Sequence, residues 1–184
     1  RRSRRNYDLF RWEPSMNDKP LQFAWGHINI NVSNLERSVA FYEKLGFESY
    51  RPGIPYLGLT SEAGVTEMPE SCAHALGLAE TTKARACIMQ LGRGFPKLDL
   101  IEIADQAQAK PLSNADLGLV RLCLAAKNLQ EDYLRLSEQG VAFISEPQLC
   151  QDGMADIAIC MDPDGTLIEL IQPHLNKWPS PASS

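Results

Sequence analysis

Four polar side chains stand out in this 184-residue sequence because each lies within a short apolar run. They are one imidazole, one guanidinium and two carboxylates, at His27, Arg121, Glu102 and Glu169. A carboxylate in the middle of so apolar a segment requires a partner, because burying an unpaired charge is costly. Imidazole and carboxylate groups move protons, whereas a guanidinium stays protonated and pairs with anions. These four residues are the first candidates for a functional site.

An internal repeat relates these residues in pairs. His27 and Arg121 are 94 positions apart (121 minus 27), and the same offset relates Gly46 to Gly140. Each copy begins with an apolar strand pattern, which leads into an amphipathic helix pattern that ends at one of the two glycines. A constant offset predicts one structural unit used twice.

The last strand of each copy can also be aligned. KLDLIEIA at 97–104 resembles GTLIELIQ at 165–172, and aligning the two segments on their glutamates makes Glu102 equivalent to Glu169. This offset is 67 (169 minus 102), so we expect the first copy to carry 27 extra residues (94 minus 67). They fall within about 50–86, a stretch rich in Gly, Pro and Ser.

The first predicted strand, at about 23–32, has one polar and one apolar face. Side chains alternate along a strand, so one face carries Trp25, His27, Asn29 and Asn31. The residues between them are apolar and suit a helix packed against that side. We expect the polar face to line a pocket.

Each copy therefore predicts a strand, a helix and three further strands. The helix of the first copy should begin at an S-x-x-E capping box formed by Ser33 and Glu36. The predicted fold class is α+β, with two tandem βαβββ units forming a cupped mixed sheet around a central cavity. The predicted organisation is an N-terminal leader at 1–20, a first unit at 21–104 with its insertion at about 50–86, a linker at 105–116, a second unit at 117–172 and a C-terminal tail at 173–184.

The composition of the chain argues against several classes of protein and of partner. The net charge of −5 argues against nucleic acid as a partner, since nucleic-acid recognition usually leaves a basic footprint. Five cysteines without a CxxC pair suit neither a disulfide framework nor a zinc knuckle, which predicts a reducing, cytoplasmic setting. No apolar run reaches the 18 or so residues of a membrane helix, so we expect no membrane partner.

Two motifs resemble the vicinal oxygen chelate superfamily, which includes glyoxalase I, bleomycin resistance proteins and extradiol dioxygenases. One is H-I-x-I-x-V-x-x-L-x-x-S-x-x-F-Y-x-x-L-G-F from His27 to Phe47, and the other is D-P-D-G-x-x-I-E-L from Asp162 to Leu170. The resemblance covers about 23–172. It implies the fold closely but leaves the reaction open, because one scaffold supports several chemistries.

The resemblance also implies a divalent metal held by the first and last strands of each unit. Carried over by position, the metal ligands are His27, Glu102 and Glu169, with Arg121 at the fourth position. Such a mixed nitrogen and oxygen set suits Zn, Ni, Mn, Fe or Mg. Arg121 cannot be a ligand, so either it has displaced the metal or it binds an anionic substrate beside it.

The resulting hypothesis is a glyoxalase-like, metal-dependent lyase or isomerase. It would remove a proton next to a carbonyl of a small oxygenated substrate, with Glu169 as general base and Arg121, Trp25, Asn29 and Asn31 binding the substrate. A substrate bound by Arg121 would be anionic. The alternatives are a non-catalytic small-molecule binding protein of the bleomycin resistance type, or an extradiol-type dioxygenase. The resemblance also implies a homodimer, in which one site can draw on two chains.

Overall fold

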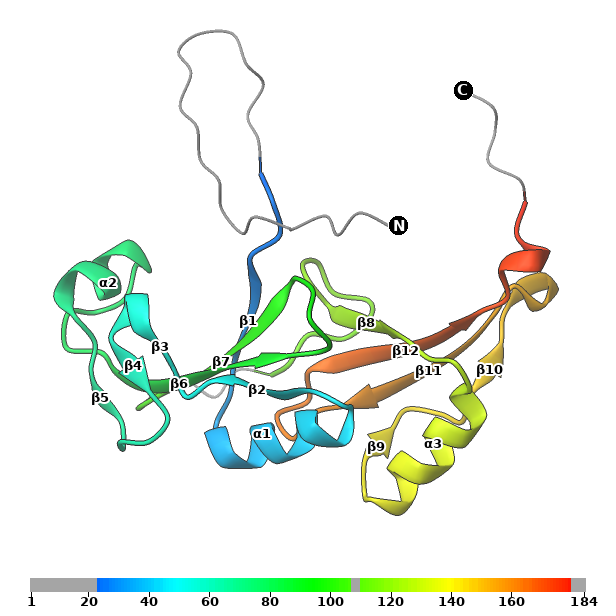
Figure 1. The fold of residues 1–184 in the computed structure, drawn as a ribbon, viewed down its shortest axis with the longest axis horizontal. Helices are drawn as coiled ribbons and strands as arrows, with labels where there is room; N and C mark the ends of the chain where they lie inside the picture. The colour runs from blue at the N-terminus through cyan, green and yellow to red at the C-terminus, as the bar shows by residue number, and fades with distance from the viewer. Residues whose placement is uncertain (1–22, 107–109, 180–184) are drawn as a thin grey trace, which may run out of the picture.

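The computed structural model describes residues 23–106 and 110–179. The predicted leader at 1–20 and the end of the predicted tail lie outside these ranges. Within them, two units of the same βαβββ design lie side by side, each with its own mixed sheet (Figure 1). The α+β fold class and the tandem βαβββ units are confirmed.

The first unit is built on a sheet with the strand order β1-β7-β6-β2. The first strand, β1, runs parallel to β7, and β6 runs antiparallel to β7. The helix α1 follows β1 and covers one face of the sheet. The bounds are β1 (His27–Asn31), α1 (Leu35–Lys44), β2 (Glu48–Arg51), β6 (Lys83–Gln90) and β7 (Lys97–Ile103).

The second unit repeats this plan with the strand order β10-β11-β12-β8. Its first strand, β8, runs parallel to β12, and β11 runs antiparallel to β12. A short strand, β9, pairs with β11. The bounds are β8 (Arg121–Ala125), α3 (Leu129–Glu138), β9 (Ala142–Phe143), β10 (Gln148–Leu149), β11 (Ala155–Met161) and β12 (Leu167–Pro173).

The first unit carries additional elements between β2 and β6. They are β3 (Gly53–Ile54), the 3-10 turn η1 (Pro55–Leu57), β4 (Leu59–Thr60), β5 (Thr66–Glu67) and α2 (Glu70–Ala75). We call the whole segment between β2 and β6, residues 52–82, the insertion. In Figure 1 its elements lie at the end of the first sheet that is farthest from the second unit.

Alternation along the strands sends apolar residues to two different cores. The face of each sheet that carries its helix contributes to one core shared by both units, which includes Ile30, Leu100, Tyr42, Leu129 and Ile168. The opposite face of the first sheet packs against the insertion, and this second core includes Ile54, Leu57, Met68, Ala86 and Ile101. The insertion therefore covers part of the face that the helix leaves free.

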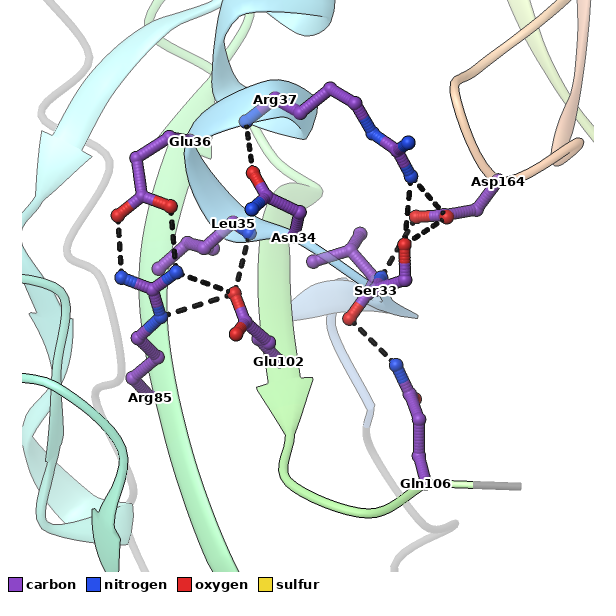
Figure 2. Close-up of polar contacts among 10 residues, drawn as sticks. Ser33, Asn34, Leu35, Glu36, Arg37, Arg85, Glu102, Gln106 and Asp164 are labelled. Carbon is purple, nitrogen blue, oxygen red and sulfur yellow. Dashed lines mark hydrogen bonds and ion pairs between the residues drawn. The ribbon is translucent and has the colours of Figure 1, made fainter. Parts of the chain in front are cut away.

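The start of α1 also joins the two units. Its N-cap is Asn34, whose side chain accepts a hydrogen bond from the backbone N–H of Arg37, so the predicted cap at Ser33 is wrong. Ser33 instead donates its backbone N–H and its hydroxyl to Asp164, in the turn before β12 (Figure 2). Arg37 pairs with the same carboxylate at 2.7 Å. Because the Ser33 hydroxyl donates to Asp164, Ser33 does not cap the helix.

Candidate active site

The parallel pairing of β1 with β7 brings His27 close to Asp99. His27 Nε2 lies 3.7 Å from Asp99 Oδ2, and both side chains lie on the helix-free face of the first sheet. Tyr56, from the insertion, donates its hydroxyl to Asp99 Oδ2 at 3.1 Å and stacks against the His27 ring with centroids 6.2 Å apart. The three side chains form a polar cluster that we call the His27 cluster.

Asp99 is the most unusual member of this cluster. Its residue is only 1% exposed, and Oδ1 is buried without a hydrogen-bond partner among the described residues. Burial raises the pKa of the Asp99 carboxyl, and the neighbouring His27 and the Tyr56 hydrogen bond offset only part of that effect. Burial and Asp99 also raise the pKa of Tyr56 to about 12, so its hydroxyl remains a donor.

A cavity of about 350 Å³ opens beside the cluster. Its polar wall comes from the first sheet and from the insertion, and contains His27, Asn29, Asn31, Asp99 and Tyr56. Its apolar wall contains Leu57, Met68, Leu76, Leu78, Ile101 and Ile103. A buried carboxylate with a raised pKa beside a largely apolar cavity is typical of a functional site.

The second unit places a different pair at the equivalent positions. Arg121 donates Nε–H to Glu169 Oε2 at 2.5 Å and a second guanidinium N–H to Asn114 at 3.0 Å. Cys123 follows on the same face of β8, where burial and the adjacent Glu169 raise the pKa of its thiol. Arg121 and Glu169 thus form an ion pair in which the two charges neutralise one another.

The strand pairing corrects the alignment of the two units. His27 is the register partner of Lys97, and Arg121 is that of Leu167, so the last strands are related by an offset of 70 (167 minus 97). The insertion therefore adds 24 residues (94 minus 70) instead of 27. With this offset, Asp99 is equivalent to Glu169.

Glu102 consequently lies on the opposite face of β7, away from His27. Its Oε2 accepts a hydrogen bond from the backbone N–H of Leu35 at 2.6 Å and pairs with Arg85 at 2.7 Å (Figure 2). Arg85 in turn contacts Glu36 of α1. The structure thus brings Glu102 to the start of the helix and not to a site shared with His27.

The equivalent of Glu102 in the second unit is Gln172 (102 plus 70). Its side chain accepts a hydrogen bond from the backbone N–H of Leu129, the first residue of α3, at 2.8 Å. Both residues thus satisfy a free donor in the first turn of the helix above them. This shared contact anchors both side chains to the start of the helix in their own unit.

The other predicted binding residues lie near the polar strand β1. Asn29 and Asn31 line the cavity, and Asn29 donates to Asn31 at 3.0 Å. Trp25 precedes the strand and is 73% exposed. It is absent from the described cavity wall.

Two residues of the His27 cluster were not predicted from the sequence. Asp99 lies between Leu98 and Leu100, as Glu169 lies between Ile168 and Leu170, and this flanking pattern was the available signal. Glu102 has the same kind of neighbours, so the pattern alone gives two answers. Tyr56 carries no motif, because an inserted segment has no counterpart in the other unit.

Comparison with known proteins now adds to this geometry. Residues 24–170 match the family model described as the glyoxalase/bleomycin resistance protein/dioxygenase superfamily. This match spans well over half of the chain. The chain belongs to that superfamily.

Solved structures of other proteins share the fold of this superfamily member. A glyoxalase family protein from Bacillus cereus is 18% identical, with a TM-score of 0.64, and the match covers 85% of this chain and 96% of that one. One from Enterococcus faecalis is 26% identical, with a TM-score of 0.53 and coverage of 79% and 94%. The trypanothione-dependent glyoxalase I of Leishmania major is 19% identical, with a TM-score of 0.54 and coverage of 82% and 87%.

Two further observations concern the full sequence and the described helices. No curated protein matches the sequence at a significant level. None of the helices within 23–106 and 110–179 has the length and apolar character needed to span a bilayer.

The divalent metal implied by the superfamily does not fit the residues as this chain arranges them. Within the described residues, no three His, Cys, Asp or Glu side chains are grouped to hold an ion. His27 and Asp99 supply only two donors. Glu169 is bonded to Arg121, whose fixed positive charge repels a dication. The described side chains therefore do not form a divalent-metal site as they are arranged within this chain.

Proposed function

We propose that this superfamily member is a glyoxalase-type lyase or isomerase that removes a proton next to a carbonyl of a small oxygenated substrate. Asp99 is the observation that supports the proposal most. It is a buried carboxylate in the cavity wall, with one oxygen unpartnered among the described residues and a raised pKa. Enzymes raise the pKa of a carboxylate in this way so that it takes up and releases a proton near neutral pH.

The His27 cluster offers a role for each of its members. In the proposed step the C–H bond next to the carbonyl breaks, its proton passes to Asp99 and its electron pair moves onto the carbonyl oxygen. His27 donates a hydrogen bond to that oxygen, and Tyr56 holds the carboxylate in place. The hydroxyl proton on the first carbon then passes to the former carbonyl oxygen, and Asp99 returns its proton to the former carbonyl carbon. The new carbonyl forms on the first carbon, so the isomerisation needs no oxidant or reductant.

We assign the general base to Asp99 in place of Glu169, the base expected from the sequence. The carboxylate of Glu169 is already paired with Arg121 at 2.5 Å. The Arg121 guanidinium thus occupies Oε2 of Glu169, whereas Oδ1 of Asp99 has no hydrogen-bond partner among the described residues. The amide groups of Asn29 and Asn31 face the same cavity as Asp99 and can bind substrate oxygens.

The test is incorporation of solvent deuterium into hydroxyacetone, followed by proton NMR of the CH₂OH group. The wild-type protein should accelerate exchange, and Asp99→Asn should lower the rate at least 100-fold, because general bases contribute roughly 10²–10⁴-fold. Asp105→Asn is the matched control, since Asp105 is exposed and lies outside the cavity. Exchange that survives in Asp99→Asn would remove the base from the proposal.

The Arg121–Glu169 pair favours a second candidate, a non-catalytic binding protein of the bleomycin resistance type. The Arg121 side chain is 39% exposed, so its guanidinium remains accessible to an anion. In this case pyruvate should bind without deuterium exchange, and Arg121→Gln should weaken its binding about tenfold or more. Lys127→Gln, which removes an exposed positive charge beyond the other end of β8, is the control. Equal binding by both variants would reject Arg121 as the anchor.

We also propose that two copies of the chain associate. In the described sheets, β1 and β8 are edge strands, whose free backbone groups invite pairing. Large apolar side chains are exposed just before these strands, at Phe23, Trp25, Leu117 and Leu119. Sedimentation of the wild type and of Leu119→Glu measures the effect: the variant should dissociate at concentrations where the wild type is a dimer.

A further inference from the structure

The cavity beside the His27 cluster has two chemically different ends. Polar groups from β1, β7 and Tyr56 form one end. Apolar side chains form the other, and the insertion supplies four of them, at Leu57, Met68, Leu76 and Leu78. Leu57 and Met68 are buried in the second core, so this wall is held rigidly against the sheet.

The described residues of the second unit form no equivalent wall. Between β9 and β11, where the first unit has the whole insertion, the second unit has only β10 and the short 3-10 turn η2 (Gln151–Gly153). Arg121 and Cys123 on the helix-free face of β8 are consequently exposed. The apolar end is thus a property of the first unit, added to the common βαβββ plan.

The charges around the cavity restrict the ligand further. Among the described residues that line it, Asp99 is the only acid, and none is a lysine or an arginine. An anionic group at the polar end of the cavity would face the Asp99 carboxylate without a compensating lysine or arginine. A neutral polar group can hydrogen-bond to Asn29, Asn31 and His27 without that repulsion.

We propose that the insertion forms a specificity subsite for the alkyl or aryl substituent of a neutral hydroxy carbonyl compound. The inference rests on the proposed function for the polar end, where the substrate oxygens meet the His27 cluster. The substituent then lies between the insertion and β7, against Leu76, Leu78 and Ile103. A volume of about 350 Å³ accommodates such a ligand, since small-molecule sites begin near roughly 300 Å³.

The experiment is a calorimetric titration of the wild-type protein with 1-hydroxy-2-alkanones of increasing chain length. Each buried methylene group should lower Kd about fourfold, which corresponds to roughly 0.8 kcal/mol. Three added methylene groups, from hydroxyacetone to 1-hydroxy-2-hexanone, should therefore tighten binding about 60-fold. A Kd that does not depend on chain length overturns the subsite, and so does a failure of the longest members to bind.

A matched pair of variants tests whether the insertion is responsible. Leu76 lines the cavity and is 50% exposed, so Leu76→Gln should fold. Leu134 is 53% exposed on α3 and lies outside the cavity, so Leu134→Gln is its control. Leu76→Gln should reduce the chain-length gain at least threefold, whereas Leu134→Gln should match the wild type. Equal gains in both variants would contradict the proposal.

Deuterium exchange on the same samples separates this inference from the proposed function. If the chain-length gain is present but no ligand exchanges its protons, the subsite stands and the proton-transfer proposal fails. If hydroxyacetone exchanges but longer members bind no better, the proton-transfer proposal stands and the subsite fails.

Discussion

The two units share a backbone plan but differ at two equivalent positions on the helix-free face of their sheets. The first unit holds His27 beside a buried Asp99, under an insertion that supplies Tyr56. The second holds Arg121 paired to Glu169, with its strand β8 exposed. Residues with structural roles are more alike, since Glu102 and Gln172 make the same contact with the following helix. The comparison shows that the fold fixes where polar groups lie, while their chemistry is set separately in each unit.

The largest expected effect comes from changing the first strand residue in each unit. His27→Ala should slow deuterium exchange into hydroxyacetone about 100-fold, because the carbonyl oxygen loses its hydrogen-bond donor. Arg121→Gln should change the rate less than threefold, because its unit makes no contact with the His27 cluster in the described chain. Proton NMR of both variants measures this contrast. A larger loss in Arg121→Gln would place the chemistry in the second unit.

Removing the side chain that contacts the start of the helix should lower the free energy of unfolding by different amounts in the two units. Glu102→Ala should cost about 2–3 kcal/mol, because it removes a charged acceptor and leaves Arg85 without one of its two partners. Gln172→Ala should cost about 1 kcal/mol, as for the loss of a neutral cap. Urea denaturation of both variants gives the two values. Equal losses of unfolding free energy in the two variants would mean that the ion pair between Arg85 and Glu102 contributes nothing.

Asp99 should lower the stability of the fold at neutral pH. Its pKa is raised in the folded state, so the folded state favours the protonated form, and stability falls as the pH rises through that raised value. Asp99→Asn should therefore be more stable than the wild type at pH 7, by on the order of 1 kcal/mol. The difference should vanish below about pH 4, near the unfolded pKa. Thermal unfolding across pH tests this, and Glu169→Gln should give no such gain.

The smallest expected effect is that of metal removal. Dialysis against EDTA should leave deuterium exchange unchanged, because the donors of the two units are not grouped around an ion in the described chain. Elemental analysis before and after dialysis is the necessary control. A rate that falls on dialysis and returns with one divalent ion would show that the units meet in an arrangement other than the one within this chain.

Sequence reasoning was accurate where a pattern repeats and inaccurate where two registers fit equally well. The constant offset between His27 and Arg121 was sufficient to predict both units and the polar face of β1. The last strand contains two acids three residues apart, Asp99 and Glu102, and each has apolar neighbours. Because an odd shift exchanges the two faces of a strand, aligning Glu102 with Glu169 paired two residues that lie on opposite faces of their sheets.

Other parts of the site depend on contacts that the sequence does not encode locally. Tyr56 reaches Asp99 across 43 residues, from an insertion without a repeat partner. Ser33 was expected to cap α1, but its partner Asp164 comes from the other unit. Asn34, the next residue, takes over the cap. In both cases a tertiary contact decided the role of the side chain.

The hydrogen bond from Tyr42 to Asp162 ties the second unit to the interior of the first. Tyr42 is fully buried in α1, and Asp162 begins the turn before β12. Together with the shared core, this contact means that the halves should melt in a single transition and that neither half should be produced in folded form alone. A chain cut at the linker should regain its fold only when both fragments are mixed, so the duplicated halves now depend on one another.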